Sequence, residues 1–158
     1  MRGPFTRRRN GDIDVTLTTV EAELLGSVVE HMTAVLDDPP PRLLPPAYED
    51  DPEAQAEYAG LMSGDLMDGK RRALSSMTAT MGRGKVKRDG WRVTLSADET
   101  QDWLAVINDA RLTLGTGLEI TEESYERDVD PSDPNAATHE LFRYLGYVEE
   151  YLVDVLMD

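Results

Sequence analysis

The chain has 158 residues, of which 40% are hydrophobic and 30% charged, proportions typical of one globular domain over residues 1–158. It contains no cysteine, which excludes disulfide frameworks, zinc–thiolate sites and thiol redox switches. With 31 acidic and 16 basic residues it has a net charge of −15, which disfavours unaided binding to phosphate backbones or anionic membranes.

The first predicted element is a β-hairpin. A strand over residues 5–9 is followed by Asn10-Gly11, a dipeptide that suits a two-residue type I′ turn because both turn positions need positive φ. The second strand alternates apolar and polar residues, its apolar positions being Ile13, Val15 and Leu17. Thr18 and Glu21 then form a capping box, which predicts a helix that runs as far as Asp37-Asp38.

Residues 39–46 are rich in proline and are interpreted as an extended connector rather than as a polyproline ligand, because they contain no P-x-x-P motif. Helical spacing resumes after Asp51-Pro52 and continues to Met81. Three glycines interrupt this stretch, and they predict two shorter helices or a bend: Gly60, Gly64 and Gly69.

The next segment repeats the first at an offset of 78 residues. Val93 and the strand around it match Val15, and Ser96 with Glu99 repeats the capping box. Chance is a rival explanation over so few positions. If the repeat is real, the two strands can pair side by side and lay both following helices on one face of a sheet.

An acidic loop over residues 119–133 precedes a final helix, for which Pro134 is the expected first position. The apolar stripe of this helix consists of Leu141, Tyr144, Leu145, Val148, Tyr151, Leu152 and Val155. The predicted fold is therefore mainly α, of α+β type. It has five or so helices and a small antiparallel sheet formed by the N-terminal hairpin and a central strand.

Positive charge is concentrated in residues 70–92, which hold eight basic residues and one acidic residue for a net charge of +7. This stretch is a candidate contact surface for a protein partner or for nucleic acid. The candidate contact residues are Arg83, Lys85, Lys87, Arg88 and Arg92. If the N-terminal hairpin pairs with the strand at Val93, we expect Arg7, Arg8 and Arg9 to lie beside them.

No recognisable catalytic or cofactor-binding motif occurs, so we expect a protein that is not an enzyme and holds no cofactor or metal. Asp128, Asp130 and Ser132 begin like a calcium loop, but Asp133 stands where glycine is needed and His139 where glutamate is needed. The methionines on apolar helix faces are interpreted as core residues.

With neither a signal peptide nor a membrane span, we expect a cytoplasmic location without membrane attachment.

One polar cluster within an apolar helix has two interpretations. Asn108, Asp109 and Arg111 can form a recognition spot, or they can form a hydrogen-bonded brace inside the fold. We favour the brace.

Several sequence strings, taken in order, resemble an actinobacterial family, a domain of unknown function whose members are described as actinomycete oxidative-stress regulators (AosR-like). Each string alone is weak, but their order covers most of the chain. The strings are Leu17-Thr18-x-x-Glu21-Ala22-x-Leu24-Leu25, Arg42-Leu43-Leu44-Pro45-x-Ala47-Tyr48, Asp50-Asp51-Pro52-Glu53, Trp103-Leu104-x-x-x-Asn108-Asp109-x-Arg111-Leu112-x-Leu114-Gly115-Thr116 and Tyr144-Leu145-Gly146-Tyr147-Val148.

The resemblance implies a non-enzymatic cytoplasmic regulator that affects transcription through a protein such as a sigma factor. This chain departs from the family where it has Ala59-Gly60 and Gly117 in place of arginines, which puts the same partner contacts in doubt. It also lacks cysteine, so an oxidative signal must act through methionine, through a partner's thiols or through abundance.

Two functional interpretations remain. The first is a regulator of oxidative-stress transcription that contacts a protein partner, such as a sigma factor or RNA polymerase, and whose acidic surface is complementary to a basic partner. Its docking surface is the basic stretch or the C-terminal stripe. That stripe can equally be core or the seam of a homodimer. The second is direct DNA binding by the basic stretch 70–92, which the acidic remainder of the chain opposes. An adaptor for proteolysis would use the same kind of protein contact.

Overall fold

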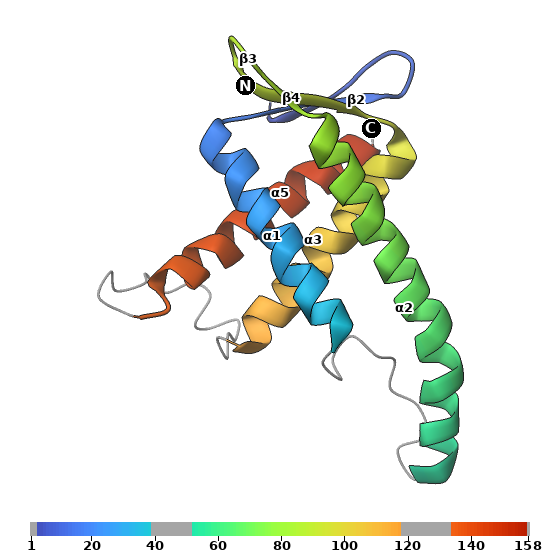
Figure 1. Ribbon diagram of the computed structural model, residues 1–158. Coiled ribbons are helices and arrows are strands. Elements are labelled where there is room, and N and C mark those ends of the chain that lie inside the picture. Colours follow the sequence, from blue (N-terminus) through green and yellow to red (C-terminus); the bar gives the residue numbers. More distant parts are fainter. Residues whose placement is uncertain (1–2, 39–51, 118–133, 158) are drawn as a thin grey trace.

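Four helices lie against one face of a four-stranded sheet in the described residues (Figure 1). The structure is a computed structural model, and it describes residues 3–38, 52–117 and 134–157. Its elements in chain order are β1 (Phe5–Arg7), β2 (Ile13–Leu17), α1 (Thr19–Asp37), α2 (Pro52–Arg83), β3 (Lys85–Lys87), β4 (Gly90–Leu95), α3 (Ala97–Gly117) and α5 (Ala136–Met157). The predicted class, mainly α with a small antiparallel sheet, is confirmed.

The strands follow the order β1-β2-β4-β3, and every neighbouring pair is antiparallel. In β2 the apolar residues Ile13, Val15 and Leu17 are buried and alternate with half-buried polar ones, because successive side chains of a strand point to opposite faces. Sequence reasoning missed β3. Its signal was Asp89-Gly90, a dipeptide typical of hairpin turns, which here joins β3 to β4.

The N-terminal hairpin is correctly predicted, but its turn is not of type I′. The Gly11 N–H donates to the Arg8 carbonyl at 3.0 Å, and the Arg8 N–H donates to the Asp12 carbonyl at 2.7 Å. These bonds enclose a three-residue loop in which Gly11 has a φ of 94°. The Asn10 carboxamide oxygen accepts the Asp12 N–H, which fixes Asn10 within the longer loop.

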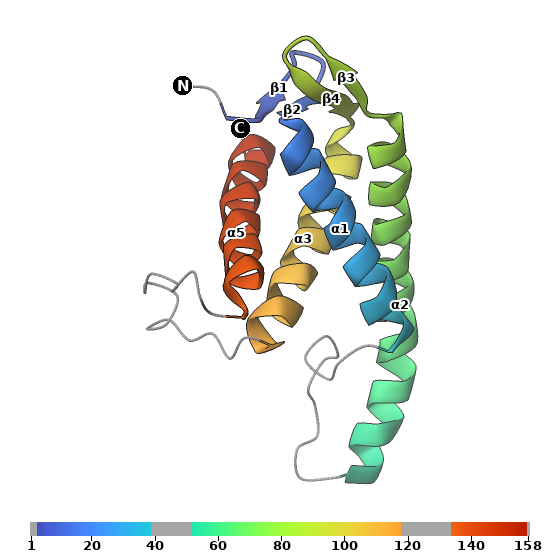
Figure 2. The same cartoon turned by 60° about the vertical axis from the view of Figure 1, so that its left-hand side comes forward.

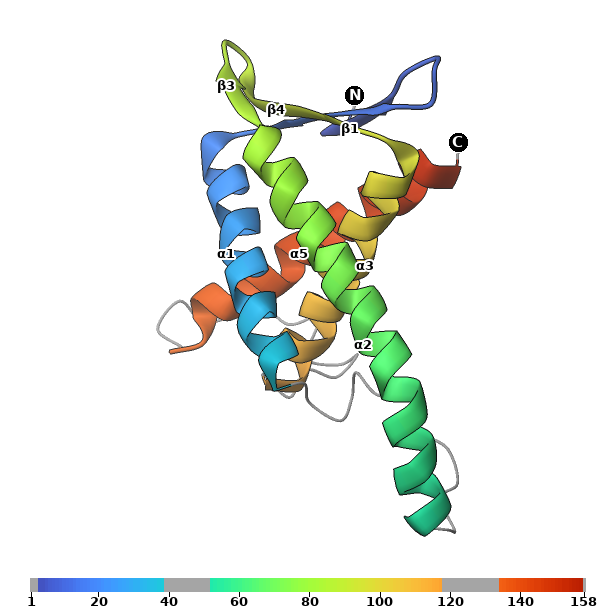
Figure 3. The same cartoon turned by 45° about the vertical axis from the view of Figure 1, so that its right-hand side comes forward.

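The two copies of the internal repeat pair with each other as expected. Val15 lies opposite its equivalent Val93 in the β2–β4 register. Because the strands are antiparallel, the other positions pair in reverse order, with Leu17 opposite Trp91. Both capping boxes form. Glu21 bonds Thr18 at 2.9 and 3.1 Å, and Glu99 bonds Ser96 at the same two distances. The helices that follow, α1 and α3, lie on the same face of the sheet (Figure 3).

The core lies between the sheet and the helices. Trp103 of α3 is fully buried, and its indole N–H donates to the Thr80 hydroxyl of α2 at 2.7 Å. Of the five methionines predicted to be core residues, Met32, Met67 and Met77 are buried and Met81 is half-buried against the core. The side chain of Met62 lies outside the described residues. No described helix is both long enough and apolar enough to cross a membrane.

The prediction of two helices or a bend within residues 52–81 is wrong, since α2 is one helix of 32 residues. This difference reduces the five or so predicted helices to four in the described residues. Gly64 and Gly69 lie on open surface, so they cost helix propensity without creating a kink. Burial of Met77 and its neighbours against α1 and α3 offsets that cost, and Figure 2 shows α2 extending past both helices.

The final helix begins at Ala136, two residues after the predicted Pro134. The Asn135 carbonyl accepts the His139 N–H at 2.9 Å, which is the first bond of the helix and places Asn135 at the N-cap. The interpretations that concern residues 39–46, Ala59-Gly60, Gly117 and the acidic loop at 119–133 involve positions outside the described residues or side chains.

Candidate functional site

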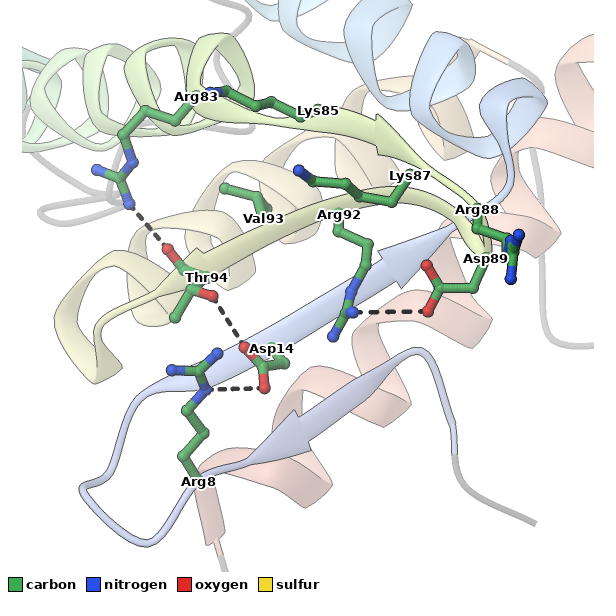
Figure 4. A pocket seen from close by; sticks show the side chains of 10 residues that line it. All are labelled: Arg8, Asp14, Arg83, Lys85, Lys87, Arg88, Asp89, Arg92, Val93 and Thr94. Atoms are coloured by element: carbon green, nitrogen blue, oxygen red, sulfur yellow. Dashed lines mark hydrogen bonds and ion pairs between the residues drawn. The ribbon is translucent and has the colours of Figure 1, made fainter.

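The outer face of the sheet, turned away from the described helices, carries the candidate site (Figure 4). Asp14 on β2 and Arg92 and Thr94 on β4 point to this face because they alternate with the buried Val15 and Val93. An open hollow of about 700 Å³ lies over these residues. It is lined by Arg8, Asp14, Arg83, Lys85, Lys87, Arg88, Asp89, Arg92, Val93 and Thr94.

All five candidate contact residues from the basic stretch line this one hollow. They come from the end of α2, from β3, from its turn and from β4. Pairing of the two hairpins also brings Arg8 to the hollow, as the sequence predicted, whereas Arg7 and Arg9 are not among the lining residues. The fold therefore gathers six cationic side chains and two carboxylates on one surface.

Two of these cations are paired with the two carboxylates that also line the hollow. The Arg8 Nε donates to Asp14 Oδ2 at 2.8 Å, and the Thr94 hydroxyl donates to Asp14 Oδ1 at 2.8 Å. The Arg8 hydrogen bond is the main reason why the pKa of Asp14 lies below its usual value. Arg92 approaches Asp89 at 3.6 Å, and both side chains are exposed.

Arg83 is occupied by the fold itself. Its Nη1 and Nη2 donate to the two Glu99 carboxylate oxygens at 2.8 and 3.1 Å, and Nη2 also donates to the Thr94 carbonyl at 2.9 Å. The guanidinium, with the Ser96 N–H that caps α3, lowers the pKa of Glu99 to about 2. Arg83 thus joins α2, β4 and the start of α3.

The remaining cations, Lys85, Lys87 and Arg88, are exposed and make no ion pair with any described residue. All three belong to the β3–β4 hairpin, so they form one patch of unneutralised positive charge. We call Lys85, Lys87 and Arg88 the basic hairpin.

The first three residues of the predicted basic stretch lie elsewhere. Lys70 binds both oxygens of Asp109 at 2.9 and 2.8 Å, in a pair whose side chains are 17% and 10% exposed. Arg71 donates to the Leu36 carbonyl at 3.2 Å, and Arg72 reaches Asp102 at 3.5 Å. These contacts tie α2 to α1 and α3, and they contribute nothing to the hollow.

The polar cluster of α3 is a brace in which two of its three residues take part. Asp109 binds Lys70 of α2, and Arg111 donates to Glu149 of α5 at 2.8 Å. The Arg111 guanidinium also lies 4.8 Å from the centre of the Phe142 ring, a cation–π contact. Asn108 is exposed and takes no part in the brace.

Tyr144 and Tyr147, the two tyrosines of the last family string, lie on α5 in different environments. Tyr144 is half-buried, and its hydroxyl donates to Glu21 at 3.1 Å, joining α5 to the capping box of α1. Burial and the Glu21 carboxylate raise the pKa of Tyr144. Tyr147 is exposed and shares a 2.8 Å hydrogen bond with Tyr151. The stripe of α5 is largely core, since Leu145, Val148, Leu152 and Val155 are buried.

The described residues contain no group of three or more His, Asp or Glu side chains arranged to hold a metal ion. His31 lies 3.1 Å from the Thr113 hydroxyl, a contact between α1 and α3. The calcium-like residues Asp128, Asp130 and Ser132 lie outside the described positions.

Fold and surface together define a small, mainly helical protein with a cluster of cationic side chains on the outer face of its sheet, although the chain as a whole has a net charge of −15. Its sequence places it plainly: the chain belongs to the DUF2017 family, a domain of unknown function whose profile matches residues 1–156. The family predicted from the sequence strings is thereby confirmed.

Similar proteins include the oxidative stress regulators AosR of Mycobacterium bovis and Mycobacterium tuberculosis. Each is 32% identical over 148 residues, a match that covers 85% of this chain and 65% of the relative. The putative oxidative stress regulator AosR of Mycobacterium leprae is 32% identical over 129 residues, which cover 73% of this chain and 57% of that protein. The chain thus spans about two thirds of the length of the relatives it matches. No solved structure matches it.

Proposed function

We propose that this chain is a non-enzymatic regulator of the response to oxidative stress, and that it alters transcription by contacting a protein such as a sigma factor or RNA polymerase. The names of the mycobacterial relatives support the regulatory role. The observation that carries the contact is the basic hairpin, where Lys85, Lys87 and Arg88 present unneutralised charge on an acidic molecule. Complementary charge speeds association and rejects wrong partners.

The oxidative signal reaches such a regulator from outside its core. The chain has no thiol, and Met32 and Met77 are buried, which shields their thioethers from oxidants. Among the methionines whose side chains are described, only Met157 is exposed. Three routes are consistent with these positions: a partner's thiols, a change in abundance or, among the methionines whose side chains are described, oxidation of the exposed Met157.

A deletion and complementation experiment tests the proposed role. Transcripts are profiled before and after a peroxide pulse in the wild-type strain, in a strain that lacks the gene and in complemented strains. We expect the deletion to reduce the induction of transcripts by peroxide, and the wild-type gene to restore that induction. A peroxide response that is unchanged by the deletion contradicts it.

Direct DNA binding is the second candidate, and Arg8 is the observation that favours it. The arginine joins the five basic-stretch residues at one hollow, so cationic side chains from both hairpins line the same surface. Titration of duplex DNA at low and physiological salt tests this candidate. Steeply salt-dependent binding that is abolished by Lys85→Ala, Lys87→Ala and Arg88→Ala together supports it, and absence of binding at low salt ends it.

A further inference from the structure

The outer strand β3 has an open edge. It is the last strand in the order β1-β2-β4-β3, and all three of its side chains are exposed. The outward N–H and C=O groups of such an edge face no other strand in the described part of the chain, and they can pair with an added strand.

The side chains of β3 specify what kind of strand fits. Lys85 and Lys87 point to the outer face, where they line the hollow with Arg92. Val86 lies between them and points to the opposite face, the face of its cross-strand partner Trp91, yet it is 68% exposed. A strand laid along this edge therefore meets two cations on one side and an apolar side chain on the other, with about 7 Å between successive residues on the same side.

A second copy of this chain does not suit the edge. Pairing β3 with another β3 places lysines opposite lysines, and like charges directly opposite one another destabilise a sheet. The lysines of β3 therefore disfavour self-association through this edge.

Nucleic acid also fits poorly. Three unneutralised cations are few beside the roughly six to ten phosphate contacts made by proteins that bind DNA strongly through its backbone. A phosphate backbone would also leave Val86 without an apolar partner.

We propose that the free edge of β3 accepts an extended segment of a partner protein, with acidic side chains at alternate positions and apolar ones between them. The carboxylates face Lys85 and Lys87, and an apolar residue covers Val86. This inference rests on the proposed function, since it names the surface and the partner chemistry of that contact.

The test is a direct binding measurement with the full chain. The probe is a fluorescently labelled peptide of alternating Glu and Val, compared by anisotropy with a scrambled peptide of the same composition and with duplex DNA. We expect the alternating peptide to bind about tenfold more tightly than the scrambled one, because only the former can place all its carboxylates on one side. Equal binding of both peptides overturns the proposal, as does preferential binding of DNA at physiological salt.

Charge reversal provides the second arm. The double variant Lys85→Glu, Lys87→Glu should no longer bind the acidic peptide and should instead bind a matched peptide of alternating Lys and Val. The control Arg9→Glu changes an exposed cation on the other hairpin and should leave binding intact. Failure of the Lys–Val peptide to bind a double variant whose circular dichroism is native overturns the proposal.

These outcomes separate the docking mode from the regulatory role. If the double variant restores the peroxide response in the deletion strain, the edge is not the docking surface and the regulatory role stands. If the peptide binds as expected while deletion leaves the transcripts unchanged, the docking mode is supported and the regulatory role fails.

Discussion

Gly90 and Leu17 meet where the two halves of the sheet join. The backbone of Gly90 has a φ of 123°, and a Cβ atom at that position would lie 2.5 Å from the Leu17 carbonyl oxygen. Glycine is therefore required here twice, for its conformation and for the close approach of β2. The turn that presents the basic hairpin depends on this contact.

Gly90→Ala should lower the free energy of unfolding by about 2 kcal/mol, because it forces a strained backbone and a steric clash together. Chemical denaturation monitored by circular dichroism measures the change. Gly69→Ala is the matched control, since nothing lies within 4 Å of the added methyl group on α2. The control should raise the free energy of unfolding by about 1 kcal/mol. Equal effects of the two substitutions would show that the turn tolerates a side chain.

The pair formed by Lys70 and Asp109 should be the most sensitive ion pair of the fold. Asp109→Ala leaves the Lys70 ammonium largely buried without its counter-charge, and we expect a loss of about 3 kcal/mol in the free energy of unfolding. Asp68→Ala, which removes an exposed partner 3.9 Å from Arg71, should cost less than about 0.5 kcal/mol. Thermal unfolding of both variants makes the comparison, and a small effect of Asp109→Ala would contradict the brace.

Tyr144→Phe removes the hydroxyl that donates to Glu21, and it should lower the free energy of unfolding by about 1 kcal/mol. Tyr147→Phe removes a hydroxyl from an exposed tyrosine pair and should have almost no effect. Denaturant titration of the two variants distinguishes a structural hydroxyl from a surface one. The reverse order of effects would be evidence against the joint between α5 and the α1 capping box.

Glu99 makes the joint at the start of α3 sensitive to acid. The pKa of Glu99 is lowered from 4.5 in the unfolded chain to about 2 in the fold. Its contribution to the free energy of unfolding is therefore complete above pH 4.5 and is lost as the pH falls towards 2. Because the pair with Arg83 is partly exposed, we expect Glu99 to contribute about 1 kcal/mol to the free energy of unfolding at neutral pH. The stability difference between the wild-type chain and Glu99→Gln, measured at several pH values, should vanish over this range. A difference that is independent of pH would contradict the assigned cause.

Local signals predicted the parts of the fold that depend on neighbouring residues. The capping boxes at Thr18 and Ser96 and the alternation around Val15 each lie within a few residues, and all form as expected. The continuity of α2 was mispredicted because its glycines are compensated by packing against helices distant in sequence.

The candidate site was predictable in composition but not in detail. Its five basic residues are close together in sequence, and the repeat indicated the strand pairing that brings Arg8 to them. Sequence could not show that Arg83 is bound by Glu99, because charge patterns do not reveal which cations find a counter-ion. Nor could it show that Lys70 turns inward to Asp109, a residue 39 positions away.

The central claim is that the basic hairpin binds a partner protein that acts in transcription. Affinity capture from a nuclease-treated native lysate tests it most directly. The tagged proteins are the wild-type chain, one triple variant that combines Lys85→Glu, Lys87→Glu and Arg88→Glu, and the control Arg9→Glu. We expect the wild type and the control to recover a sigma factor or RNA polymerase, and the triple variant to recover neither. Recovery of the same partner by all three proteins, or of nothing but the chain itself, would contradict the account.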